Sequence, residues 1–310
     1  MTLTPAKAGS AGAGSLPAGR RQPTGRAALL IALPLMTAAL LLSLDPVRAA
    51  IGPGRLPAVV LWGLPALALL LAFAGPPLPA RDARLVASAS APFFSPALRI
   101  LPWMAGAFLL DQSFMGIAHL LGWVSFTYGD QNLAAHPLKT VLIGVPACLL
   151  LGSIGTERAL RSGVLDGAAK RWGMPAGLAL SVAAGLALTV PALVGAGEFG
   201  DPSFVAAALV VALVREIGFC LIYLRGGGLP LAGLGRGLLM FFEGRIITDV
   251  ESLFLPLAQY TTSEPRFDLL RAATAVAALL LVIWGCRRST AGASDAGVGG
   301  GATARRAASE

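Results

Sequence analysis

Apolar residues follow one another along most of this chain in blocks of roughly 18 to 25, separated by short polar segments. A helix needs ~20 apolar residues to cross the ~30 Å hydrocarbon core of a bilayer. Backbone groups in lipid must find their hydrogen bonds within the segment, so each block is expected to be helical. The blocks predict eight transmembrane helices, at about 27–44, 57–75, 100–124, 138–155, 174–196, 204–224, 231–257 and 269–286.

The composition supports the same interpretation. Of the 310 residues, 55% are hydrophobic and only 13% are charged, and the mean hydropathy is +0.74. Soluble domains are roughly 25% charged, so the lipid bilayer is the expected surroundings of this chain. We therefore predict a single all-α, polytopic integral membrane domain over 27–286. The tails 1–26 and 287–310 are rich in small and polar residues and are predicted to be disordered.

The placement of Lys and Arg favours one orientation of these helices. With a cytoplasmic N-terminus, most of the basic residues fall on the inner side, as the positive-inside rule requires. We therefore predict a multi-pass protein of the cell's inner or plasma membrane with both termini cytoplasmic. This bias also accounts for the net charge of +8, and no basic stripe is interleaved with aromatics, so no nucleic-acid partner is expected. A cleaved signal peptide ending near 47–50 stays open as an alternative for the first block.

The polar joint at 156–173 has a helical pattern of its own. Leu160, Val164, Ala168 and Trp172 recur at every fourth position, while the basic residues of the joint take other faces. A helix with one apolar face and a basic remainder is typical of the membrane interface. The pattern predicts a helix lying in the inner headgroup layer.

Charged side chains inside the predicted spans are the strongest functional signal, because charge in hydrocarbon is costly and such residues usually serve a site. They lie in the third, sixth and seventh predicted helices, which would form a polar site between them. The candidate residues are Asp111, His119, Arg215, Glu216, Arg236, Glu243, Arg245, Asp249 and Glu251.

Glu216 is the acid expected to matter most, because it lies in the middle of its apolar block. Adjacent residues on a helix do not face one another, so Arg215 is a poor partner for it. We expect Glu216 to pair with Arg236 or Arg245, or to lie protonated near Asp111. The cluster is then either a proton- or ion-responsive or acid–base site, or a set of ion pairs that fixes how the helices align.

Several chemistries are disfavoured by what the sequence lacks. His119 and His136 are its two histidines, it has no His-Glu-x-x-His motif, and it has no nucleotide-binding motif. Zinc sites built from histidine and cysteine are therefore nearly excluded. No metal and no cofactor are expected.

One short segment invites a comparison. Residues 156–163 read Thr-Glu-Arg-Ala-Leu-Arg-Ser-Gly and place Glu157 four positions before Arg161. This spacing resembles part of the Glu-Glu-x-x-x-Arg motif of the CAAX-processing and bacteriocin-processing glutamic intramembrane proteases. Thr156 stands where the motif has its first Glu, and the later histidines of those enzymes have no counterpart after His136. The resemblance implies a degenerate, non-proteolytic relative rather than a member of the family.

The leading hypothesis for function is a small permease or transport-associated protein with its site between the third, sixth and seventh helices. A second hypothesis is an intramembrane enzyme, protease-like or lipid-modifying, that uses Glu216 with Glu243 or Asp111. A third is a non-catalytic subunit with another membrane protein as partner. Whether the chain is an enzyme stays open, as does the choice of a small-molecule, lipid or peptide substrate.

Overall fold

The computed structural model describes residues 25–52, 59–74, 94–128, 142, 145–195, 202–242, 258–262, 264 and 266–307, and these are almost entirely helical. The N-terminal half contains α1 (Gly25–Leu42), α2 (Asp45–Ile51), η1 (Val59–Gly63), α4 (Leu64–Ala74), α6 (Phe94–Leu120), β1 (Val124–Tyr128) and α9 (Val145–Leu149). The C-terminal half contains η4 (Leu150–Leu165), α10 (Asp166–Trp172), α11 (Met174–Gly195), α12 (Pro202–Leu221), η6 (Ile222–Gly227), α13 (Leu229–Phe241), β2 (Ala258–Thr262) and α14 (Arg266–Ala307).

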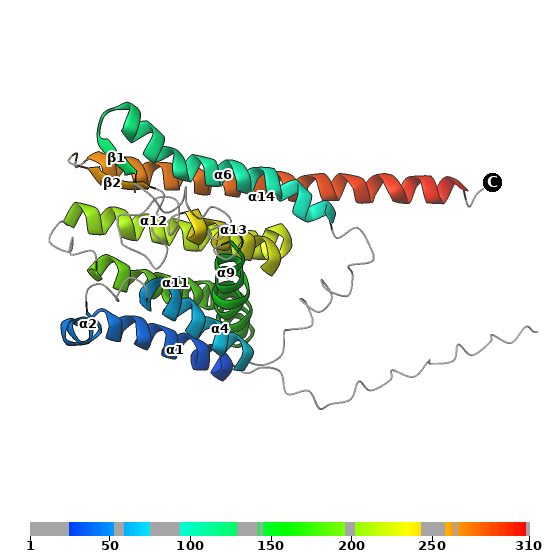
Figure 1. The fold of residues 1–310 in the computed structure, drawn as a ribbon. Helices are drawn as coiled ribbons and strands as arrows, with labels where there is room; N and C mark the ends of the chain where they lie inside the picture. The colour runs from blue at the N-terminus through cyan, green and yellow to red at the C-terminus, as the bar shows by residue number, and fades with distance from the viewer. Residues whose placement is uncertain are drawn as a thin grey trace, which may run out of the picture.

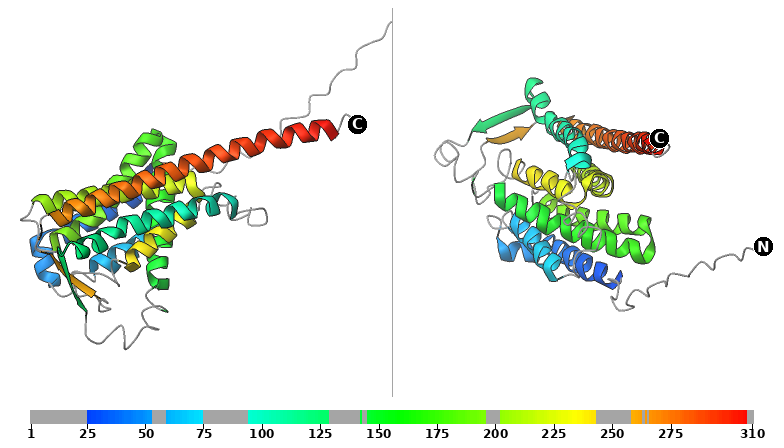
Figure 2. Two further views of the ribbon diagram at one scale, coloured as in Figure 1. Left: turned by 90° about the horizontal axis from the view of Figure 1, so that it is seen from above. Right: turned by 90° about the vertical axis from the view of Figure 1, so that its right-hand side faces the viewer.

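The long helices lie roughly side by side in layers (Figures 1 and 2). Helices α6 and α14 form one edge, α12 and α13 come next, α11 follows, and α1 with α4 forms the opposite edge. One apolar core joins α6, α12, α13 and α14, and a second joins α1, α4, η4 and α11. Of the two polar groups described below, one lies beside the first core, and the other connects helices of both cores.

Helix η4 crosses this arrangement instead of running along it, and extends from α13 toward α1 (Figure 1). Glycines allow close packing at both crossings. A Cβ atom on Gly152 would lie 2.9 Å from the Cα atom of Gly237 on α13, and a Cβ atom on Gly163 would lie 2.5 Å from Cδ1 of Ile31 on α1. Small residues at helix crossings are the usual packing device in membrane proteins.

Several helices are long and apolar enough to cross a membrane. Four of the described helices meet this requirement, at Ile100–Leu120, Met174–Pro191, Pro202–Arg225 and Arg266–Arg288. A fifth is added if α1 and α2, which are bent by 77° relative to each other, count as one span. Of two shorter apolar helices, Leu64–Phe73 lies within the second predicted span and Leu229–Phe241 overlaps the start of the seventh. The predictions of an all-helical fold and of membrane-spanning segments are thus supported.

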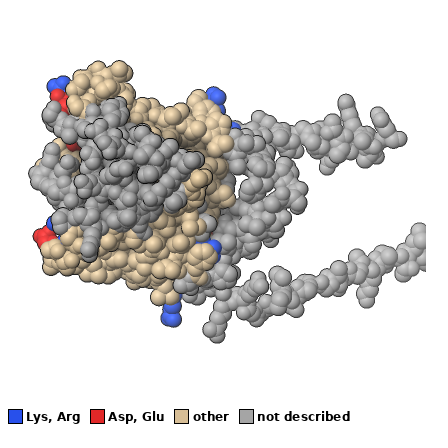
Figure 3. All heavy atoms as spheres, in the orientation of Figure 1, with Lys and Arg blue, Asp and Glu red and all other residues tan. Residues whose placement is uncertain are grey.

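The outer surface agrees with a lipid environment. On the face shown in Figure 3, charged side chains lie toward the two ends of the bundle, with uncharged residues between them. Large leucines point outward from four helices, and their exposed fractions would be unusual in water. They include Leu30 at 70%, Leu70 at 67%, Leu109 at 69%, Leu269 at 72% and Leu280 at 61%.

Two features differ from the all-helical expectation with disordered tails. Strand β1 pairs with β2 in an antiparallel ribbon, with Phe126 opposite Tyr260. A short strand is marked only by its distant partner, which a local apolar pattern does not show. Helix α14 also runs on to Ala307, through most of the tail 287–310 that was predicted to be disordered. Extending an existing helix needs no new nucleus, which favours this continuation. The tail 1–26 lies outside the described residues up to residue 24.

The joint at 156–173 is helical, as predicted, but it does not lie free in a headgroup layer. Leu160, Val164 and Ala168 have no exposed surface, and the first two belong to the core made with α1 and α4. The predicted apolar stripe therefore faces protein, and Trp172, at 45% exposed, is its one outward member. The basic face expected toward water includes Arg161, which is fully buried and forms ion pairs with two glutamates.

Candidate functional site

An ion pair joins the third and sixth of the predicted spans. Arg215 on α12 donates a hydrogen bond from Nη2 to Oδ2 of Asp111 on α6, at 2.6 Å. Gln112 donates from Nε2 to the same carboxylate oxygen at 2.8 Å. Both members of the pair lie near the middle of helices long enough to cross a membrane, and Asp111 is buried. Asp111 therefore contacts Arg215 and does not lie beside Glu216, because successive side chains on a helix such as α12 point about 100° apart.

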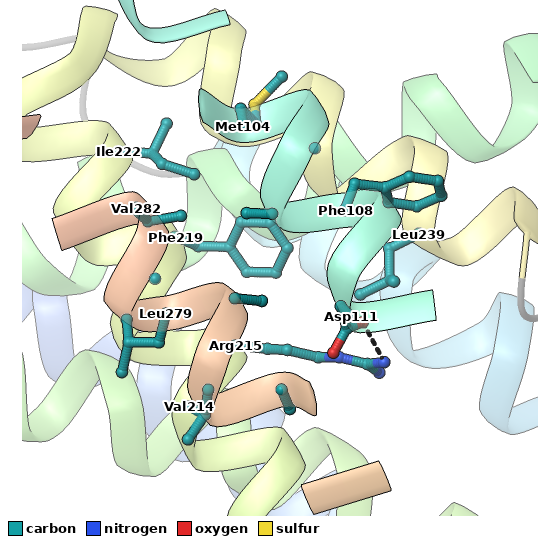
Figure 4. Close-up of a pocket in the computed structure, with 15 residues that line it drawn as sticks. Met104, Phe108, Asp111, Val214, Arg215, Phe219, Ile222, Leu239, Leu279 and Val282 are labelled. Carbon is teal, nitrogen blue, oxygen red and sulfur yellow. Dashed lines mark hydrogen bonds and ion pairs between the residues drawn. The ribbon is translucent and has the colours of Figure 1, made fainter. Parts of the chain in front are cut away.

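A cavity of about 80 Å³ lies beside this pair, between α6, α12, α13 and α14. Among the described residues that line it, Asp111 and Arg215 are charged and all others are apolar or glycine. Figure 4 shows the Arg215 side chain reaching across from α12 to Asp111, with Phe219, Phe108 and Leu239 around it. The arrangement is a small apolar chamber with one ion pair in its wall.

A second polar cluster lies deeper, where η4 crosses α12 and α13. Arg161 on η4 donates from Nε to Oε2 of Glu157 at 3.0 Å and from Nη2 to Oε2 of Glu216 at 2.6 Å. Arg236 on α13 contacts Oε1 of both glutamates. We call these four residues the ion-pair quartet. Each carboxylate oxygen of its two glutamates accepts a hydrogen bond from an arginine, and the two negative charges match the two positive ones.

The remaining contacts of the quartet are also satisfied. Arg161 donates from Nη1 to the hydroxyl of Ser181 on α11 at 2.7 Å, and that hydroxyl donates to the carbonyl oxygen of Leu160 at 2.9 Å. The guanidinium carbon of Arg236 lies 4.6 Å from the centre of the Phe219 ring, a cation–π distance. The quartet therefore joins η4, α11, α12 and α13, and Phe219 separates it from the cavity, whose wall it also forms.

The backbone of α11 makes room for the carboxylate of Glu216. A Cβ atom added to Gly185 would lie 2.3 Å from Cδ of Glu216, closer than any real contact. Glu157, Arg161 and Ser181 have no exposed surface, and Glu216 is 4% exposed. Charges buried this completely are tolerated only when they are paired and hydrogen-bonded, as they are here.

The structure brings together four of the residues that the sequence singled out, in two groups. Asp111 pairs with Arg215, and Glu216 contacts Arg236, one of the two partners expected for it. His119 lies apart from both groups, near the end of α6, with its Nδ1 3.4 Å from the carbonyl oxygen of Val124. The other candidates, Glu243, Arg245, Asp249 and Glu251, lie outside the described residues.

The sequence pattern did not place Glu157, Arg161 and Ser181 in the site. The signal for the first two was present, since Glu157 and Arg161 are four residues apart and form the Glu-x-x-x-Arg spacing already described. They were expected at the membrane interface because polar residues interrupt the apolar blocks there. Thr156, at the place of the motif's first Glu, is buried, and its hydroxyl has no hydrogen-bond partner among the described residues. Ser181 gives no local signal at all.

Comparisons of the chain with protein-family models, with curated proteins and with solved structures give no match. The two groups of charged residues must therefore be interpreted from their geometry. A general base or a nucleophile needs a carboxylate within reach of a substrate. The carboxylates of the quartet are buried and already bonded to arginines, whereas Asp111 and Arg215 border a cavity. The cavity is thus the better candidate for binding, and the quartet is suited to holding helices together.

Proposed function

We propose that this chain is a small permease or transport-associated protein of the cell's inner or plasma membrane. In this proposal it crosses the membrane about eight times and has both termini in the cytoplasm. The observation that carries the proposal is the Asp111–Arg215 pair in the wall of a cavity between α6, α12, α13 and α14. Ionisable residues inside a bilayer typically mark pathways for substrates or ions.

The position of the pair supports transport over a purely structural role. Asp111 and Arg215 come from two different helices, so breaking their contact lets those helices separate. A substrate that competes for either member would couple its own binding to helix movement, which is the requirement for alternating access. The quartet supplies the complementary part, because it holds η4, α11, α12 and α13 together as a fixed body.

Uptake into proteoliposomes tests this proposal. The wild-type chain is compared with Asp111→Asn for labelled rubidium, acetate and L-valine, which represent cations, anions and zwitterions, between about pH 5 and 8. We expect one solute to enter at least about tenfold faster with the wild type, since the amide of Asn cannot form the ion pair. Asp45→Asn, which alters an exposed side chain on α2, is the control. Uptake equal to that of empty vesicles for every solute would contradict a permease.

The quartet favours one further candidate. Glu157 and Arg161 carry the spacing of the glutamic intramembrane proteases, and they meet Glu216 and Arg236 at the centre of the bundle. Because all four charges are already paired, we propose at most a non-catalytic relative, which would act as a subunit beside another membrane protein. Purified chain in detergent should then cleave no labelled peptide and modify no lipid, but should co-purify with its partner. Turnover without a gradient that is lost in Glu157→Gln would instead identify an enzyme.

A further inference from the structure

One outer face of α14 changes along its length from apolar to aromatic to basic. Val276, Leu280, Trp284 and Arg288 follow one another at every fourth position, so they lie along one side of the helix, and all four are exposed. We propose that this face, together with the neighbouring end of α6, binds an anionic phospholipid of the phosphatidylglycerol class. The inference requires that α6 and α14 cross a membrane, and it does not depend on which solute is transported.

The order of these residues matches the order of the parts of a phospholipid. Val276 and Leu280 offer apolar surface to an acyl chain, and tryptophan is typical of the level between hydrocarbon and headgroups. Arg288 is the last residue of the apolar segment Arg266–Arg288, so we expect it where the hydrocarbon ends and the phosphates begin. A guanidinium binds phosphate through charge-assisted hydrogen bonds. A dissolved anion would use the arginine alone and leave the apolar residues without a partner.

Two tryptophans support Arg288 at this position. The guanidinium carbon of Arg288 lies 4.2 Å from the centre of the Trp284 ring, a cation–π distance. Trp284 in turn contacts Trp103 of α6 edge to face, with ring centres 4.9 Å apart. The two helices approach closely here, since a Cβ atom on Gly285 would lie 2.6 Å from the Cβ atom of Trp103. The arginine is therefore positioned before a lipid binds, which reduces the entropy lost on binding.

The charge at this end of the α6–α14 pair favours an anionic lipid over a zwitterionic one. Arg288 forms no ion pair with any described residue. Arg99 comes immediately before the apolar segment Ile100–Leu120, one helical turn before Trp103, and gives this end a second positive charge. A zwitterionic lipid carries a cation of its own, whereas phosphatidylglycerol carries only negative charge. Attraction to anionic lipid raises affinity about fivefold for each Lys or Arg near the membrane surface.

The side chains outside the described part of the chain do not reverse this balance. The stretches 1–24, 75–99 and 289–310 belong to this end of the bundle by their connections, and they contain eight basic and three acidic residues. Glu243, Asp249 and Glu251 belong to the stretch that joins α13 to β2, and β2 lies at the opposite end (Figure 1). On the face shown in Figure 3, the described residues toward the two tails include Lys and Arg, and acidic side chains appear at the other end.

Native mass spectrometry of the purified full chain in detergent tests the inference. The chain is titrated with dioleoyl phosphatidylglycerol or with dioleoyl phosphatidylcholine, and the dissociation constants of the first bound lipid are compared. We expect phosphatidylglycerol to bind the wild type at least about tenfold more tightly. The double variant Arg99→Gln with Arg288→Gln should reduce this preference to less than about threefold.

A matched control removes two charges from another place at the same end of the bundle. Lys170 and Arg171 are exposed on α10, which packs through Gly167 against Ala28 near the start of α1. Adjacent residues on one helix do not face one another, so these two are not arranged to bind a single phosphate. The double variant Lys170→Gln with Arg171→Gln should therefore keep the preference of the wild type for phosphatidylglycerol.

Four results would overturn the inference. Equal affinity of the wild type for the two lipids would show that charge does not select the lipid, and this comparison does not depend on how any variant folds. A folded Arg99 and Arg288 variant with the wild-type preference would mean that the lipid binds elsewhere. An equal loss in the Lys170 and Arg171 variant would indicate the diffuse charge of this end and no defined site. Glycerophosphoglycerol, the headgroup without acyl chains, should not displace the lipid at equal concentration, and displacement would identify a dissolved anion as the ligand.

Discussion

In the described part of the chain, Arg161, Arg215 and Arg236 each form an ion pair with a glutamate or aspartate of the helical bundle. Arg215 and Glu216 are neighbours in sequence, yet they serve different groups, the first facing Asp111 and the second facing Arg161 and Arg236. An angle of about 100° between successive side chains makes this separation inevitable. Arg215 of α12 can therefore line the cavity while Glu216, the next residue, forms ion pairs with η4 and α13.

The quartet predicts a specific loss of stability when its charge balance is broken. Glu216→Gln keeps the shape of the side chain but leaves two buried guanidinium groups with one carboxylate. We expect the free energy of unfolding to fall by about 3–5 kcal/mol. The double variant Glu216→Gln with Arg236→Gln restores one glutamate for one arginine, and should lose less than the sum of its single variants.

Denaturant unfolding of the purified chain in detergent measures these changes. Asp45→Asn, on the exposed surface of α2, is the control and should change stability by less than about 0.5 kcal/mol. A Glu216→Gln variant as stable as the wild type would mean that the quartet contributes no net stability. Strictly additive losses in the double variant would mean that Glu216 and Arg236 do not interact.

At the level of elements, the crossing of η4 over the other helices decides where the charges lie. The helix carries Glu157 and Arg161 into the space between α11, α12 and α13, where both are fully buried. The crossing depends on close backbone contact, and Gly237 on α13 is packed against Leu149 and Cys148 at its start. A side chain at this point would push the helices apart.

Gly237→Ala tests this dependence. The added Cβ would lie 2.9 Å from the Cα atom of Leu149 and 3.1 Å from the carbonyl oxygen of Cys148, both backbone atoms that cannot rotate away. We expect a loss of about 1–3 kcal/mol, the usual effect of overpacking. Thermal unfolding in detergent measures it, with Gly116→Ala as the control because open space surrounds that position. Equal unfolding temperatures for Gly237→Ala and the control would show that the crossing is not tightly packed.

For the whole molecule, the arrangement of the helices bears on the orientation in the membrane. The N-terminal end of α1 and the C-terminal end of α14 lie at the same end of the bundle (Figure 1). This agrees with an even number of crossings between them, which the positive-inside rule also requires for the predicted orientation.

Reporter fusions at the two termini check the predicted orientation. Alkaline phosphatase, which is active only outside the cytoplasm, should be inactive at both ends, and green fluorescent protein should be fluorescent at both. A matched pair of fusions after residue 52, at the far end of α1 and α2, should give the reverse result. Phosphatase activity at the C-terminus would contradict the cytoplasmic location and the count of eight spans.

The sequence by itself determined that the chain is helical and apolar enough to span a membrane, because a bilayer imposes length, hydropathy and internal hydrogen bonding on each segment separately. It also singled out Asp111, Glu216 and Arg236 as candidate site residues, since a charge within an apolar block can be recognised locally. Only the tertiary structure decided which charges meet. The burial of Glu157 and Arg161 depends on the direction of η4, the β1–β2 ribbon on a partner far along the chain, and the cavity on four helices packing together. These features are contacts between segments that are distant in the sequence. The spacing of apolar residues within one segment carries no information about the direction in which another segment runs.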